Sequence, residues 1–261
     1  MPGPSAEEQY FLELLNETRL DPMGNAARYI SSYSGDDAIQ ANIQQAMDYY
    51  GVDGDALFTA YSALNPVGAL AWSEQLSTAA EGHNAKMITA DTQSHQVTGE
   101  LSLGDRLKAA GYTFRSAGEN IYAYGDDILY SHAGFMIDWG YDAEDIDTGN
   151  VVKSNFADLG DGMQDPAGHR NNIMSGGFTE VGIAVTHETD PRSSVGEMVV
   201  TQDFGSRGKL FVTGVAYTDR DGDNFYSIGE GRGDLRISAG SANVTSWETG
   251  GYSLEVPAGA V

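Results

Sequence analysis

Apolar side chains recur at helical spacing through the first part of the chain. Residues 5–20 repeat them every three or four positions behind Ser5, a favourable N-cap, and the repeat ends at the Asp21-Pro22 pair. A second strong repeat covers residues 72–90, with Ser73 at its N-cap position. Shorter stretches of the same period predict further helices over residues 37–50, 56–61, 103–110 and 126–139.

Strand patterns dominate the second part of the chain. Residues 118–124 start as a turn and continue as a strand, so Glu119 is expected at the beginning of that strand. Residues 179–188 and 197–204 predict two strands joined by a longer loop. Beyond residue 207 the helical period is absent, and Gly-rich turns separate predicted strands over residues 210–218, 235–239, 243–247 and 251–256.

The change of pattern near residue 207 divides the chain of 261 residues, which is long enough to bury a sizeable core. We expect a domain of helices and strands over residues 1–206 and a small all-β module over residues 207–261. The Asp- and Gly-rich stretch over residues 140–162 is longer than a compact domain needs. We interpret it as an insertion, a lid or an ion-binding loop.

Composition places the chain among folded proteins and excludes nucleic acid as a partner. Apolar residues make up 41% and aromatic residues 10% of the sequence. Asp and Glu number 38 against 14 Lys and Arg, which gives a net charge of -24 that would repel a phosphate backbone. Cysteine is absent, so disulfides and thiolate metal sites are excluded.

The chain carries no pattern of membrane insertion. No apolar run reaches the roughly 20 residues of a membrane-spanning helix, so we expect no transmembrane segment. The start, Met1-Pro2-Gly3-Pro4, lacks the basic and apolar regions of a signal peptide. No pattern fixes the oligomeric state.

A short helix predicted to begin at Asp165-Pro166 places His169 in its first turn. The positive end of the helix dipole disfavours a protonated imidazole there. A neutral histidine can ligate a metal or accept a proton at pH 7. Taken alone, His169 could equally be a capped surface residue.

Four sequence segments stand in an order typical of one protein family. They are Leu14-Leu15-Asn16-Glu17-Thr18-Arg19, Ser94-His95, Gly118-Glu119-Asn120, and Gly168-His169-Arg170-Asn171-Asn172-Ile173-Met174 with Phe178-Thr179-Glu180-Val181-Gly182-Ile183. Together they resemble the CAP superfamily of cysteine-rich secretory proteins, venom antigens and plant pathogenesis-related proteins, in its bacterial, cysteine-free branch. The resemblance covers about residues 6–206 and implies an α/β fold, a three-layer α-β-α sandwich with an open cleft, in a secreted protein.

The resemblance also implies a cleft with two histidines and two acids, which match His95, Glu119, His169 and Asp138. The family usually has glutamate at the fourth position, and the shorter Asp138 would reach its partner only through water. Two imidazoles are suitable ligands for Zn²⁺, and the alternative metal in the cleft is Mg²⁺. The carboxylates would orient the ring nitrogens. The alternative is a hydrogen-bonded polar cluster that binds nothing. His83 and His132 are interpreted as helix residues with packing or surface roles.

A second motif lies in the predicted β module. Carboxylates follow the EF-hand spacing, at loop positions 1, 3, 5 and 12, and a backbone carbonyl is expected at position 7. Position 6 is Asn224, which tolerates the positive φ that glycine usually supplies. We predict a structural Ca²⁺ site, the alternative being a solvated acidic turn. Its expected ligands are Asp219, Asp221, Asp223, Phe225, Ser227 and Glu230.

Three functions compete on these residues. The first, which we favour, is a secreted CAP protein whose cleft binds a divalent cation and a small ligand such as a lipid, sterol or glycan. The second is a metal-assisted hydrolase acting on peptide or cell-envelope substrates, with Glu119 as general base or, less favoured, Ser94 as nucleophile. The third is an extracellular adhesion or matrix module in which the CAP domain is a scaffold.

Overall fold

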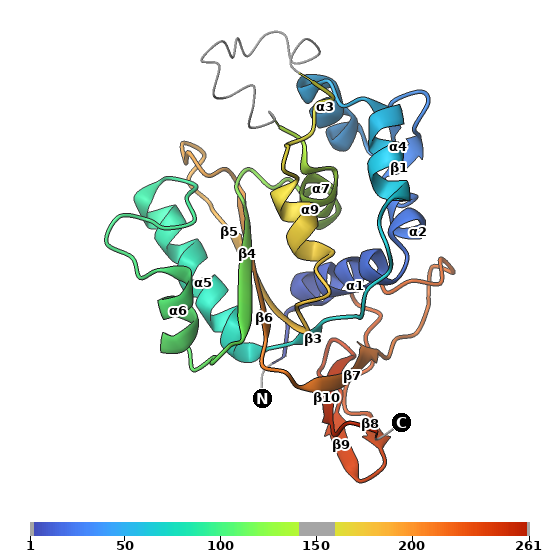
Figure 1. Cartoon of the computed structure of the whole chain (residues 1–261), viewed down its shortest axis with the longest axis vertical. Coiled ribbons are helices and arrows are strands. Elements are labelled where there is room, and N and C mark those ends of the chain that lie inside the picture. The colour runs from blue at the N-terminus through green and yellow to red at the C-terminus, as the bar shows by residue number, and fades with distance from the viewer. Residues whose placement is uncertain (1–2, 141–159, 260–261) are drawn as a thin grey trace. The chain divides into compact units, whose positions relative to one another are not determined.

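The computed structural model describes residues 3–140 and 160–259 and shows helices and strands in an α/β chain (Figure 1). Contacts group the chain into two units, and helix α1 (Ala6–Leu20) contributes residues to both. The first unit comprises Met1–Asn16, Gly68–Ile128 and Gly176–Val261, and the second comprises Glu17–Val67 and Leu129–Ser175.

The first helix is the one that the apolar repeat predicts. Its N-terminus carries a capping box, in which the Glu8 N–H donates to Ser5 Oγ over 3.3 Å and the Ser5 N–H donates to Glu8 Oε2 over 2.8 Å. It ends at Leu20, and the Asp21 side chain then caps helix α2 (Pro22–Ala26). None of the described helices is long and apolar enough to cross a membrane.

A four-stranded mixed sheet forms the centre of the first unit. Its strand order is β3-β5-β6-β4, with β3 parallel to β5 and the other pairs antiparallel. The hairpin predicted from residues 179–204 is confirmed as β5 and β6. The strands are β3 (Ala71–Trp72), β4 (Ser116–Tyr122), β5 (Glu180–His187) and β6 (Met198–Ser206).

Strand β4 corrects the prediction for Glu119. The strand begins at Ser116, so Gly118 and Glu119 lie inside it and pair with Phe204 and Asp203 of β6. A glycine read as a turn signal is here a ladder residue, because the pairing with β6 overrides its local preference. Glu119 therefore lies opposite a second acid.

Helices α5 (Glu74–Ala90) and α6 (Leu103–Ala109) pack beside this sheet (Figure 1). The predicted helix over residues 72–90 starts at Glu74, because Trp72 belongs to β3. A Cβ on Gly182 of β5 would lie 1.9 Å from the Ser77 nitrogen, so only glycine allows this approach of α5. Apolar side chains fill the space between helices and sheet, among them Leu76, Met87, Leu107, Tyr112, Ile121 and Val199.

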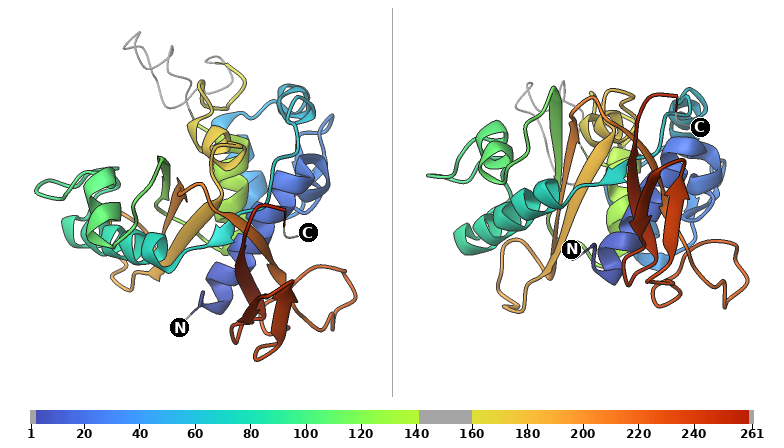
Figure 2. Two further views of the ribbon diagram at one scale, coloured as in Figure 1. Left: turned by 60° about the horizontal axis from the view of Figure 1, so that its bottom comes forward. Right: turned by 90° about the horizontal axis from the view of Figure 1, so that it is seen from below.

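The four strands predicted after residue 207 are confirmed, and they form two two-stranded sheets in the first unit (Figure 2). The Trp72 N–H of β3 donates to Ser253 Oγ over 2.9 Å. The domain boundary at residue 207 stays a prediction. The strands are β7 (Leu210–Val215), β8 (Arg236–Ala239), β9 (Ala242–Thr245) and β10 (Gly251–Val256).

The second unit is mainly helical. The first residues of the predicted helix 37–50 instead form a small antiparallel pair, and the predicted helix 126–139 becomes an α-helix followed by a π-helix. Of the loop predicted over residues 140–162, residues 141–159 lie outside the described residues. The remaining elements are β1 (Ile30–Ser32), β2 (Asp37–Ala38), α3 (Ala41–Tyr50), α4 (Gly54–Ser62), α7 (Ile128–Ala133), η1 (Gly134–Asp138) and α9 (Gly168–Ile173).

His132 of α7 is fully buried in the second unit, which confirms a packing role. Its Nε2 lies 2.8 Å from Asn25 Oδ1 and 3.1 Å from Thr18 Oγ1, so it joins three segments of this unit. Burial lowers the pKa of His132 to about 3.

Because the pKa of His132 is lowered to about 3 on folding, only the unfolded chain takes up this proton between pH 6.5 and 3. The contribution of neutral His132 to the free energy of unfolding is complete above about pH 6.5. It decreases as the pH falls and is lower by about 2 kcal/mol at pH 5. In chemical denaturation, the stability difference between the wild type and His132→Gln should shrink by about this amount from pH 7 to pH 5. A difference independent of pH would contradict the assignment, and His187→Gln, at an exposed histidine, is the control.

Candidate functional site: two histidine–carboxylate pairs

The first pair lies at the edge of the sheet in the first unit. His95 follows α5 in a polar turn with its side chain 61% exposed, and its Nδ1 lies 2.9 Å from Oε1 of the buried Glu119. An ionised carboxylate can only accept a hydrogen bond, so Nδ1 carries a hydrogen, and in the neutral ring the lone pair is then on Nε2. This is the tautomer in which Nε2 can ligate a metal.

Glu119 is held in the ionised form by its neighbours. Burial alone would raise the pKa of Glu119, but the hydrogen bond from His95 and the charges of His83, Arg106 and His95 outweigh it. The pKa of Glu119 is therefore below its usual range. Arg106 Nη2 donates to Glu119 Oε2, and Arg106 Nη1 donates to the His95 carbonyl over 3.1 Å.

A second layer of polar residues that sequence analysis missed supports this pair. His83 of α5 is fully buried, with Nδ1 3.0 Å from each Glu100 oxygen and Nε2 3.9 Å from Glu119 Oε2. Glu100 Oε2 also lies 3.5 Å from Arg106 Nη1. The one available signal was His83 itself, a titratable residue on the apolar side of a predicted helix.

The second pair lies in the second unit. His169 Nδ1 is 2.6 Å from Oδ1 of Asp138, which is fully buried at the end of η1. The backbone N–H groups of His169 and Arg170 donate to Asp138 Oδ2 over 3.0 and 3.3 Å. The shorter acid therefore contacts its histidine directly, and the expectation of contact only through water is wrong.

Backbone geometry supplies the reach that the shorter side chain lacks. Asp138 has φ +59, in the left-handed region, at the end of the π-helix. Helix α9 begins at Gly168 and not at the predicted Asp165-Pro166, and His169 still lies in its first turn. Arg170 Nη1 fixes α9 to η1 by donating to the carbonyls of Met136 and Ile137, both over 3.0 Å.

The two pairs share one chemical design. In each, a buried carboxylate receives the histidine Nδ1–H, which fixes the ring and, in the neutral form, puts the lone pair on Nε2. His95 and Glu119 belong to the first unit, and His169 and Asp138 to the second. Ser94 Oγ donates to the Gln96 carbonyl over 3.0 Å, and within the described ranges it makes no hydrogen bond to His95.

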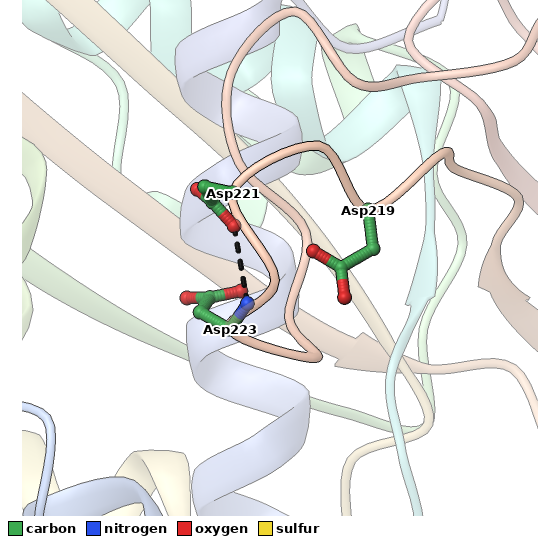
Figure 3. Close-up of side chains that lie close together, drawn as sticks. All are labelled: Asp219, Asp221 and Asp223. Atoms are coloured by element: carbon green, nitrogen blue, oxygen red, sulfur yellow. Dashed lines mark hydrogen bonds between the residues drawn. The ribbon is translucent and has the colours of Figure 1, made fainter.

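The predicted calcium loop brings three of its six expected ligands together. Oxygens of Asp219, Asp221 and Asp223 lie within 4.8 Å of one another, and the Asp219 carboxylate faces the other two (Figure 3). Asn224 at the sixth loop position has φ +60, as the motif requires. The Asp223 N–H donates to Asp221 Oδ1 over 3.3 Å.

The last three expected ligands make contacts inside the loop. Ser227 Oγ donates to Asp221 Oδ2 over 3.1 Å, and the Phe225 N–H donates to Asp223 Oδ1 over 2.8 Å. Buried Glu230 accepts the backbone N–H of Arg220 over 2.6 Å and that of Ser227 over 3.0 Å. Glu230 is thus directed at the loop backbone and is not part of the group of three aspartates.

Two solved structures show similarity to this chain. Among solved structures, an extracellular SCP-domain protein from Bacillus anthracis str. Ames is 24% identical, with a TM-score of 0.37, over 64% of this chain and 40% of its own. A cysteine-rich secretory protein from Staphylococcus aureus subsp. aureus Mu50 is 12% identical, with a TM-score of 0.30, over 66% of this chain and 42% of its own. This chain therefore spans about two fifths of either neighbour.

The search of curated proteins gave no match. The family model described as CAP, the cysteine-rich secretory protein family, matches residues 12–204, which is well over half of the chain and includes His95, Glu119, Asp138 and His169. The predicted α/β fold class, with small strands at the C-terminal end, is confirmed. The chain therefore belongs to the CAP family of cysteine-rich secretory proteins.

Proposed function

We propose that this is a secreted CAP protein whose two histidine–carboxylate pairs bind one divalent cation together with a small ligand of the lipid, sterol or glycan class. The observation that carries the proposal is that His95 and His169 each hold Nδ1 on a buried carboxylate. Carboxylate–histidine pairs of this kind hold metal ligands in the binding tautomer. The secretory character of the family supports an extracellular location.

The donor set favours zinc over magnesium. Imidazole nitrogen is a ligand for Zn²⁺, whereas Mg²⁺ prefers oxygen and retains several waters. A bound zinc ion would supply Lewis acidity and an open coordination position for an oxygen of the ligand. His95 and His169 would provide the nitrogen ligands, and Glu119 and Asp138 would orient them.

The contacts of the two acids support binding more than hydrolysis. Glu119 receives N–H groups from His95 and Arg106, and its pKa is below the usual range, which makes it a weak general base. Both Asp138 oxygens accept hydrogen bonds from the start of α9. No described contact favours the hydrolase or the adhesion alternative.

We also propose that the C-terminal loop binds Ca²⁺ and stabilises the strands around it. Three carboxylates within 4.8 Å of one another, on a loop with the required positive φ at Asn224, suit a hard cation with oxygen ligands. The calcium would be structural, because a bound ion adds folding free energy to a small all-β segment that has no disulfide.

A zinc titration tests whether the two pairs share one ion. With calcium saturating, calorimetry should show one zinc ion per chain, and His95→Ala and His169→Ala should each weaken it at least about 10²-fold, since both supply ligands. The double variant should bind little more weakly than either single variant, because the site is already lost. His187→Ala, at an exposed histidine bonded to Glu7, should bind as the wild type does.

Other outcomes contradict the shared site. If each single variant keeps one intact zinc ion, the pairs are separate sites, and if the wild type binds none, the polar-cluster alternative holds. Glu119→Gln should weaken zinc binding about 10–100-fold, the usual effect of removing an orienting carboxylate.

Calcium should raise the melting temperature of the C-terminal strands. At a calcium concentration of about 100 times Kd, binding adds about 2.7 kcal/mol of stability, which raises the melting temperature of a small module by about 10–20 °C. Excess chelator should abolish the rise, as should Asp221→Asn. Asp234→Asn, an exposed aspartate of the same segment outside the loop, is the matched control, and melting unaffected by calcium or chelator would contradict the site.

A further inference from the structure

Asp203 of β6 is a buried acid that the proposed site does not yet explain. It is fully buried and lies directly opposite Glu119 in the antiparallel register of β4 and β6. Opposite residues of an antiparallel pair project from the same face of a sheet, with Cβ atoms about 5 Å apart. The side chains of Glu119, which contacts His95, and Asp203 therefore project side by side from one face of the sheet.

No donor reaches Asp203. Neither of its oxygens has a hydrogen-bond partner among the described residues. The nearby cation, Arg106, donates to Glu119 and lies 3.5 Å from Glu100, while His83 is directed at Glu100. An ionised Asp203 would thus be a buried charge without a partner, which costs several kcal/mol.

The electrostatic surroundings of Asp203 also favour its protonated form. Burial is the largest cause that raises the pKa of Asp203 well above its usual value, and the negative charge of Glu119 raises it further. Arg106 acts in the opposite direction, and Glu100 adds to the rise. Two facing carboxyl groups in one site cannot readily both ionise, so one of them keeps a proton.

We propose that Asp203 is a positioning residue that keeps its proton at neutral pH and donates its O–H to Glu119. Glu119 then receives hydrogen from His95, Arg106 and Asp203, and its carboxylate stays aligned with His95 Nδ1. The role toward His95 rests on the proposed cation-binding function, whereas the protonation of Asp203 does not.

The isosteric variant Asp203→Asn tests the protonation through stability. With a raised folded-state pKa, Asp203 makes its full contribution to wild-type stability only at low pH, because above about pH 4 the unfolded chain releases a proton that the folded chain keeps. Asn cannot ionise and avoids this penalty. The melting temperature of the variant relative to that of the wild type should therefore increase as pH rises from 4 to 7. The increase should be about 2–4 °C for each unit by which folding raises the pKa of Asp203.

Two comparisons make the result decisive. Asp105→Asn removes an exposed carboxylate whose pKa is lowered, so its small effect should have the opposite sign. In the wild type labelled with ¹³C-carboxyl aspartate, the resonance that Asp203→Asn removes should report a protonated acid at pH 7. An ionised resonance, or a variant that loses stability relative to the wild type as pH rises, would overturn the proposal.

The positioning role has its own readout. Asp203→Leu removes the O–H donor and should weaken zinc binding at His95, while Asp203→Asn, whose amide can donate to Glu119, should restore most of the affinity. Equal affinity in the Leu and Asn variants would overturn the positioning role. If the wild type binds no zinc, the cation proposal fails, and the stability and ¹³C results still decide the protonation of Asp203.

Discussion

A buried carboxylate needs hydrogen-bond donors, and the arrangement of both histidine pairs follows from that need. Removing a carboxylate from water is costly unless N–H or O–H groups replace the lost hydration. Glu119 is satisfied by side chains, since Arg106 and His95 both donate to it. Asp138 is satisfied mainly by backbone, since the first N–H groups of α9 point at its Oδ2. The same need fixes each histidine, because the ring Nδ1–H is one of the required donors.

Side-chain donors at Glu119 and backbone donors at Asp138 require different arrangements of the surrounding elements. Side-chain donors can come from distant elements, and around Glu119 they come from α6 and the turn that carries His95. Backbone donors require the helix start itself to lie against the acid. In the second unit this requires a π-helix, a left-handed Asp138 and the bonds from Arg170 to the π-helix carbonyls. Backbone strain at Asp138 is the cost of using a short acid there.

The sequence predicts those features that depend on neighbours along the chain. The apolar repeat located α1, α5 and the β5–β6 hairpin, and the motifs located the four residues of the two pairs, because each signal lies within a short stretch. The prediction of a turn at Gly118 is wrong, because the place of Gly118 in β4 is decided by pairing with Phe204, which lies 86 residues later in the chain. Asp203 and Arg106 belong to no motif, and their proximity to Glu119 exists only after the sheet and α6 have formed. No local sequence pattern predicts the π-helix.

The two proposed cation sites differ in whether their ligands come from one stretch of the chain or from distant elements. The calcium loop draws its ligands from one stretch of the chain, so spacing alone located Asp219, Asp221 and Asp223. Glu230 does not join this group of three, because its carboxylate accepts the backbone N–H groups of Arg220 and Ser227. In a chain with 38 acidic residues, position in a motif therefore says less than the donors around each carboxylate. Exposed acids can exchange water for a cation at little cost, whereas Glu119, Asp138 and Asp203 are buried and must each be matched by a donor or keep a proton.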